Sequence, residues 1–292
     1  MKKVVIIGAK GFIGKHLEWY LKTKLHIVPE CYDVIDDNSP HYHNVDMTNC
    51  ESVATINFDV DYIFYMVGMT GTKVGFDKYA QFVNINEISF LNLLDAIRKS
   101  KFRPKIVFPS SRLIYRGADK KLKECDEKDT KTIYAVNKLA CESYLKVYNY
   151  NFDIPYTIFR ICVPYGNMLD NNYSFGTVGF FIKMATSGKD IPLYGGGAIK
   201  RTFSHIEDIC YQMIYGAFTH ASDNHTYNIG GETCSLHDAA RLVAQKYGVN
   251  VITTPWPEDD LRLESSHTYF DDTEIQKLLG GFKYLHSLVE LR

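Results

Sequence analysis

The sequence contains no apolar run long enough to span a membrane, no surplus of basic residues and no Cys-x-x-Cys pair. A net charge of −1 provides no general basic field, so we expect neither nucleic acid nor an anionic membrane as a partner. Lys2-Lys3 precedes only a short apolar segment, which does not resemble a signal peptide. Seven cysteines without metal-ligand spacing predict reduced thiols, a cytoplasmic location and no metal site.

The composition is that of a globular protein. Residues of hydrophobic type make up 46% of the chain and charged residues 23%, which excludes disorder as the main state. With 292 residues, the chain can form one large domain or a cofactor-binding domain with a smaller lobe.

A glycine-rich segment near the N-terminus is the strongest local signal. Val4–Ile7 is a run of four apolar residues, typical of a strand buried on both faces of a parallel sheet. Gly8, Gly11 and Gly14 follow and open a helix that we expect to reach about Lys22. In this context glycines permit a tight turn, a close approach to a pyrophosphate and close packing of helix on strand. The helix N-terminus attracts phosphate, so the segment predicts a dinucleotide site.

The next segment bears on which dinucleotide is bound. Leu25–Tyr32 is expected to be the second strand, and an acidic residue after such a strand holds the adenosine ribose hydroxyls. Asp33, Asp36 and Asp37 are all candidates for that residue. Residues 25–72 contain no Lys or Arg. Because a ribose 2′-phosphate finds no cation there, the segment favours NAD over NADP.

Two later segments bring polar groups to the edge of the sheet where open α/β folds bind ligands. Asp61–Gly68 is expected to be the fourth strand, followed by Thr70. Lys105–Ser111 is expected to be the fifth strand and ends in two serines. Between them, Phe82–Lys99 is expected to form one long amphipathic helix.

A tyrosine and a lysine four residues apart predict acid–base chemistry. Tyr134 and Lys138 lie within an expected helix from Thr132 to Tyr148, so both side chains share one face. The ammonium, together with a nicotinamide cation, favours the phenolate and lowers the tyrosine pKa. Tyr134 is then suited to exchange a proton with a substrate hydroxyl while hydride moves to or from nicotinamide. Ser111 is suited to hydrogen-bond the reacting oxygen.

Taken together, the glycine spacing, the serine-ended strand and the Tyr-x-x-x-Lys pair make residues 4–166 resemble the extended short-chain dehydrogenase/reductases, in particular the nucleotide-sugar epimerase/dehydratase group. The resemblance implies an α/β fold with a Rossmann-type, doubly wound parallel sheet. It also implies an NAD-binding domain at residues 1–166, which carries the catalytic residues, and a smaller substrate lobe, interleaved with it, at residues 167–292. Family members commonly form homodimers through two long helices of each subunit, so we expect a homodimer.

The resemblance further assigns roles to individual residues. It implies that Lys138 also holds the nicotinamide ribose. The cofactor-binding set is Gly8, Gly11, Phe12, Ile13, Gly14, Asp33, Asp46, Met47, Gly68, Asn86, Tyr134 and Lys138. The substrate, a nucleotide diphosphate sugar, is expected to contact Thr70, Arg112, Val163 and Arg201. Relatives often carry Asn where this chain has Val163, which places the usual diphosphate contact in question.

Departures from the family narrow the reaction. The 4,6-dehydratases carry Asp-Glu directly after the catalytic hydroxyl, and the GDP-fucose synthases carry a Cys shortly after it. This chain has Arg112-Leu113 there, so redox at a single carbon, C4 of the hexose, is favoured. An NAD-dependent 4-epimerase is the leading interpretation, and a reductase of 4-keto-6-deoxy sugar nucleotides is the alternative. A third, more distant interpretation is a dinucleotide-sensing protein without turnover, although such a protein has no need of Ser111, Tyr134 and Lys138 together.

Overall fold

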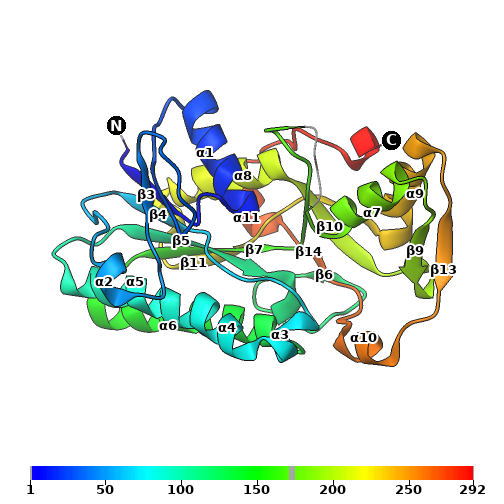
Figure 1. Ribbon diagram of the computed structural model, residues 1–292, viewed down its shortest axis with the longest axis horizontal. Coiled ribbons are helices and arrows are strands. Elements are labelled where there is room, and N and C mark those ends of the chain that lie inside the picture. The colour runs from blue at the N-terminus through cyan, green and yellow to red at the C-terminus, as the bar shows by residue number, and fades with distance from the viewer. Residues whose placement is uncertain (1, 171–174, 292) are drawn as a thin grey trace.

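The computed structural model describes residues 2–170 and 175–291 and contains a central sheet of seven parallel strands (Figure 1). The spatial order is β11-β7-β5-β4-β1-β2-β3. The strands are β1 (Val4–Ile7), β2 (Glu30–Asp33), β3 (Tyr42–Asn44), β4 (Tyr62–Tyr65), β5 (Lys105–Ser111), β7 (Tyr156–Ile161) and β11 (His225–Asn228). The chain runs outward from β1 to β3 and then crosses back to β4. The predicted doubly wound sheet is therefore confirmed, with its crevice between β1 and β4.

Helices cover both faces of this sheet, which explains the unbroken apolar run of β1. Val4 and Ile6 pack into one hydrophobic cluster and Val5 and Ile7 into another. The first face carries α1 (Phe12–Lys24), α8 (Ile206–Ala217) and α11 (Thr273–Leu278) (Figure 1). The second face carries α2 (Cys50–Val53), α3 (Val74–Asp77), α4 (Tyr79–Val83), α5 (Ser89–Lys99) and α6 (Ile133–Phe152).

The helix expected over Phe82–Lys99 is divided. Between α4 and α5, residues Asn84–Ile88 form a π-helical segment. The wider turn inserts a residue into the α-helical repeat and is frequent at functional sites. Asn86, a member of the predicted cofactor-binding set, lies within this segment and is buried.

A smaller lobe lies beyond the carboxyl end of the main sheet (Figure 1). Its strands pair as β12-β10-β8, β13-β9 and β14-β6 around a third hydrophobic cluster. The strands are β6 (Lys121–Leu122), β8 (Val163–Tyr165), β9 (Ile191–Tyr194), β10 (Lys200–His205), β12 (Glu232–Ser235), β13 (Val251–Thr254) and β14 (Tyr269–Phe270), and the helices are α7 (Gly176–Thr186), α9 (Leu236–Tyr247) and α10 (Glu258–Leu263). The boundary expected at residue 166 stays a prediction. Beyond that residue, α8 and β11 belong to the larger lobe, so segments of the two lobes alternate along the chain. No helix in the described part of the chain is long and apolar enough to cross a membrane.

Candidate active site

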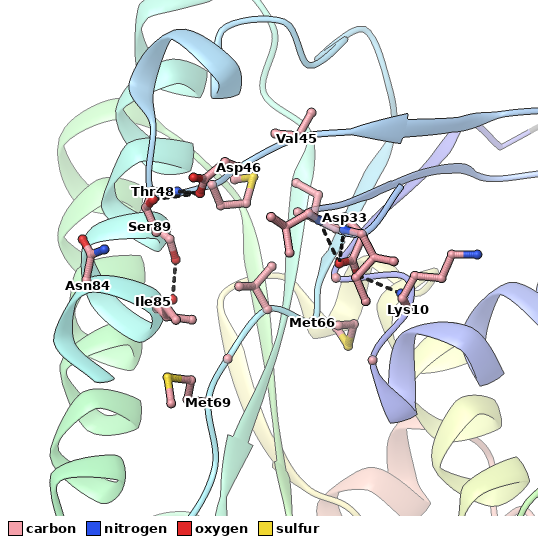
Figure 2. A pocket seen from close by; sticks show the side chains of 18 residues that line it. Lys10, Asp33, Val45, Asp46, Thr48, Met66, Met69, Asn84, Ile85 and Ser89 are labelled. Atoms are coloured by element: carbon pink, nitrogen blue, oxygen red, sulfur yellow. Dashed lines mark hydrogen bonds between the residues drawn. The ribbon is translucent and has the colours of Figure 1, made fainter. Parts of the chain in front are cut away.

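A cavity of about 540 Å³ opens at the carboxyl ends of β1, β2 and β4, at the crevice of the sheet (Figure 2). Its walls combine the glycine loop, the segments after β2, β3 and β4, and the π-helical segment. The lining residues are Ile7, Gly8, Lys10, Gly11, Asp33, Val34, Ile35, Val45, Asp46, Met47, Thr48, Met66, Val67, Gly68, Met69, Asn84, Ile85 and Ser89.

The glycine loop has the shape that a phosphate cradle requires. Gly8 has φ +84°, a conformation that disfavours any side chain, and its N–H donates to Tyr32 O at 2.8 Å. A Cβ on Gly14 would lie 2.2 Å from Gly8 O, so only glycine lets α1 pack this closely on the loop. The helix begins at Phe12, and its N-cap residue is Gly11, which has no side chain. The N-terminus of a helix attracts an anion.

Of the three aspartates that the sequence offers for the adenosine ribose, Asp33 lines the cavity. Its Oδ2 accepts the Lys10 N–H at 2.8 Å and its Oδ1 accepts the Val34 N–H at 2.8 Å. Asp36 instead accepts a bond from Asn44, and Asp37 pairs with the Lys10 ammonium. The structure thus places Asp33 at the cavity, and its role in holding a ribose stays a prediction.

Asp46 and Met47 lie on the same cavity wall. Asp46 Oδ1 accepts the Thr48 N–H at 2.8 Å, whereas Asn49 caps α2. The N-cap of α2 is therefore Asn49 and not Asp46, which lines the cavity.

The π-helical segment clamps the loop after β4. Asn86 Oδ1 accepts the Met69 N–H at 2.7 Å and its Nδ2 donates to Met69 O at 3.1 Å. A Cβ on Gly68 would lie 3.2 Å from Asn86 Oδ1 and 3.8 Å from Lys138 Nζ. Gly68, which lines the cavity, therefore lies next to both Asn86 and Lys138. Asn137 continues this network, because its Oδ1 accepts from Asn86 Nδ2 at 3.1 Å. No motif in the sequence indicates this role of Asn137.

Ser111, Tyr134 and Lys138 come together although the serine is 23 residues from the tyrosine in the sequence. Ser111 ends β5, and Tyr134 lies in the first turn of α6, close enough for the Ser111 hydroxyl to act on the pKa of the Tyr134 phenol. Lys138 Nζ donates to Pro109 O at 2.7 Å and lies 5.8 Å from the centroid of the Tyr134 ring. All three side chains are buried. The predicted catalytic residues therefore form one cluster, and their roles stay predictions.

Burial dominates the titration of this cluster in the polypeptide alone. It raises the pKa of Tyr134 to about 12, against the hydrogen bond from Ser111 and the charge of Arg112. It lowers the pKa of Lys138 to about 8. The lowered pKa of Tyr134 that the sequence predicts assumes a nicotinamide cation beside the phenol, and the polypeptide alone does not contain that cation.

The four residues proposed for substrate binding lie in different surroundings. Thr70 is exposed in the loop after β4, and Val163 is buried in the apolar core of the smaller lobe. Arg112 and Arg201 both hold the segment 264–268. Arg112 donates to Ser265 and Thr268 at 3.2 and 3.1 Å.

Arg201 is fully buried and therefore does not present its guanidinium to solvent. It pairs with Glu264 at 2.6 Å and donates to Ser266 O. Burial and the nearby Arg112 lower its pKa to about 10. Arg201 can contact a phosphate only if its ion pair with Glu264 is broken. Glu264 does not belong to any motif that the sequence shows.

A second buried cluster, outside the cavity, joins His205, Glu207 and His286, with ligand atoms within 4.8 Å of one another. The two imidazole rings lie with their centroids 3.6 Å apart and their planes tilted by 31°, and both ring nitrogens of His286 are hydrogen-bonded to carboxylates, of Glu207 and Glu290. Glu207 is occupied by Lys24 at 2.9 Å and by His286 at 2.8 Å. The arrangement is that of an ion-pair network.

Comparison with known proteins gives a consistent picture. The family described as "NAD dependent epimerase/dehydratase family" matches residues 4–230. An uncharacterised UDP-glucose epimerase of Bacillus subtilis is 27% identical, with 95% of this chain and 92% of that protein covered. The dTDP-L-rhamnose 4-epimerase of Burkholderia thailandensis is 24% identical, with 85% and 82% covered.

Solved structures share the fold. A UDP-glucose 4-epimerase of Thermus thermophilus in complex with NAD has a TM-score of 0.84 at 21% identity, covering 99% of this chain and 96% of that one. A partial consensus L-threonine 3-dehydrogenase also reaches 0.84, at 19% identity and with the same coverage. Because these identities are low, the structures support the fold, and the reaction must be argued from the site.

Proposed function

Because the chain belongs to the NAD-dependent epimerase/dehydratase family, we propose that it is an NAD-dependent 4-epimerase acting on a nucleotide diphosphate sugar. The observation that carries the proposal is the buried Ser111–Tyr134–Lys138 cluster next to the loop after β4. Relatives named as 4-epimerases support the reaction class. Dehydration is not supported, since Arg112 and Leu113 follow the serine and provide no carboxylate.

The residues present fit a dinucleotide. The glycine cradle would hold the pyrophosphate, Asp33 the adenosine ribose, and Asp46 and Met47 the adenine. Lys138 and Tyr134 would hold the nicotinamide ribose. When bound, the nicotinamide supplies reversible acceptance of a hydride. We propose NAD as the cofactor rather than NADP, because Asp33 lines the adenosine end of the cavity.

The chain's own groups handle the proton. Tyr134 takes the proton of the C4 hydroxyl as the carbon is oxidised and returns it when the opposite face of the keto sugar is reduced. Ser111 hydrogen-bonds the same oxygen and keeps it within reach of the phenol. The Lys138 ammonium lies 5.8 Å from the centroid of the Tyr134 ring, and its positive charge favours the phenolate that this proton transfer requires.

A 4-keto-6-deoxy sugar nucleotide reductase is the second candidate. Val163 favours it, because this buried apolar side chain makes no polar contact to a diphosphate where relatives often carry Asn. An epimerase keeps its reduced cofactor until the sugar has turned over, whereas a reductase consumes external NADH.

One absorbance experiment separates the two. The purified protein is incubated with NAD and UDP- or dTDP-hexoses, with the sugars analysed by chromatography, and separately with NADH and a dTDP-4-keto-6-deoxyhexose, and the NADH band is followed in both reactions. We expect interconversion of the 4-hydroxy sugars with no net change in NADH. Net consumption of NADH with the keto sugar, without interconversion of the hydroxy sugars, would establish the reductase instead.

We also propose a homodimer through α4, α5 and α6. Exposed apolar side chains on these helices support it, namely Val83, Val136 and Val147 together with Ile88 of the π-helical segment. Size-exclusion chromatography with light scattering tests it, and a mass near 33.5 kDa would contradict the dimer.

A further inference from the structure

The adenosine end of the cavity contains a cation that the sequence pattern does not place there. Residues 25–72 have no Lys or Arg, yet Lys10 of the glycine loop folds against that segment. Among the described residues that line the cavity, Lys10 is the one with a basic side chain. An ammonium at this position is the group that a ribose 2′-phosphate needs.

Lys10 connects two aspartates through two different groups. Its backbone N–H donates to Asp33 at 2.8 Å, while its ammonium pairs with Asp37. Figure 2 shows the ammonium extending away from Asp33. The two charged side chains of the pair are only 30% and 21% exposed, and the ammonium also lies 4.5 Å from the centroid of the Tyr42 ring.

The carboxylate of Asp37 is itself held in place. Its Oδ1 accepts the Ser39 N–H at 2.7 Å. Hydrogen bonds from Lys10 and then Ser39 lower the pKa of Asp37 to about 2, so it stays charged at any working pH. The loop that carries it is fastened by the Tyr42 hydroxyl, which donates to Ile35 O at 2.7 Å.

We propose that Asp37 is a cofactor-specificity residue that acts by withholding the Lys10 ammonium from the adenosine ribose. With Lys10 paired, the ribose faces the carboxylate of Asp33, which accepts bonds from hydroxyls and repels a 2′-phosphate. Without the Asp37 carboxylate, Lys10 is free to pair with that phosphate. The proposal rests on the dinucleotide site of the proposed function and is independent of the sugar chemistry.

The test measures binding of NADH and NADPH by fluorescence titration, after bound dinucleotide has been removed, with no sugar present. In Asp37→Asn we expect NADPH affinity relative to NADH to rise about tenfold, the effect of one modest ion pair. Asp36→Asn is the matched control, since Asp36 bonds to Asn44, and its ratio should stay within about twofold of the wild type. The double variant Lys10→Met/Asp37→Asn should lose the gain.

Three outcomes would overturn the proposal. The first is an unchanged ratio in Asp37→Asn when NADH still binds. The second is a gain that persists in the double variant, because the loss of negative charge alone would then explain it. The third comes from Lys10→Met alone, which carries the test if Asp37→Asn does not fold: a fall in NADPH affinity relative to NADH would show that Lys10 reaches the phosphate while Asp37 is intact. Loss of epimerase activity with any sugar bears on the proposed function and leaves this test intact.

Discussion

Two buried cations, Arg160 of β7 and Lys138 of α6, differ in how far neighbouring groups compensate their charges. Arg160 forms a two-pronged pair with Glu142 at 2.9 and 2.7 Å and also donates to the Tyr115 hydroxyl and to Glu124 O. Lys138 has a hydrogen bond to Pro109 O. Although burial opposes charge at both sites, Glu142 raises the pKa of Arg160, whereas the pKa of Lys138 falls to about 8. The structural cation is fully compensated, and the one in the proposed active site is not.

The largest effect on stability is expected when the partner of a buried charge is removed. Arg160→Met leaves Glu142 as a buried, unpaired carboxylate, so the free energy of unfolding should fall by about 3–5 kcal/mol. Urea denaturation measures it. The double variant Arg160→Met/Glu142→Leu is the control and should recover most of the loss. An equal loss in both variants would show that packing, and not the unpaired charge, is responsible.

The next effect is catalytic. Tyr134→Phe removes the proposed proton carrier, and we expect kcat to fall by at least about 10²-fold while NADH binding is retained. Tyr150→Phe is the matched control on the same helix, because Tyr150 is 87% exposed. Turnover of Tyr134→Phe within a few-fold of the wild type would remove this residue from the mechanism.

Lys138→Met should stabilise the fold while it abolishes turnover. A buried ammonium whose pKa is lowered from 10.5 to about 8 costs stability below pH 8, and that cost disappears as pH rises toward 10.5. We expect the variant to gain about 1–2 kcal/mol in unfolding free energy at pH 7 and less at pH 9.5. Thermal unfolding at both pH values measures the difference. A loss of stability at pH 7 would mean that the ammonium is compensated after all.

The smallest effect on stability is expected at His286, whose imidazole contacts the carboxylates of Glu207 and Glu290. Burial works against the charged ring of His286, yet hydrogen bonds to Glu207 and Glu290 raise its pKa. A group with a raised pKa contributes stability at low pH, and this contribution is lost as pH rises through the folded pKa. His286→Gln should therefore lower unfolding free energy by about 1 kcal/mol at pH 6.5 and by less at pH 9. His220→Gln, at a fully exposed histidine, should change neither value. An equal loss at both pH values would assign the effect to packing alone.

The parts of the site that the sequence predicts are those determined by local geometry. The spacing of Tyr134 and Lys138 places both on one helix face, and parallel strands deliver Ser111 to the same edge as the glycine loop. The family and the doubly wound fold, predicted from the same segments, are confirmed. These features depend on short stretches of chain whose periodicity is visible in the sequence.

The parts that the sequence does not predict depend on distant contacts or on local deviations. The pairs Lys10–Asp37 and Arg201–Glu264 join residues far apart in the chain. The π-helical turn in the expected helix over Phe82–Lys99 does not disturb the apolar pattern enough to be seen. The second strand, expected to begin at Leu25, begins at Glu30, because His26 adopts a positive φ of 55° and Pro29 cannot donate to the sheet.

The position of β11 at the edge of the main sheet has a consequence for how the chain folds during synthesis. β11 pairs with β7, and the Lys105 ammonium of β5 donates to Ala217 O at the end of α8 and to Ser222, which follows this helix. A nascent chain that has emerged only as far as β7 therefore exposes an unpaired strand edge and a lysine without its partners. The larger lobe cannot be completed until the ribosome has passed residue 278, the end of α11, after all strands of the smaller lobe have been made. The order of translation thus obliges the two lobes to fold together.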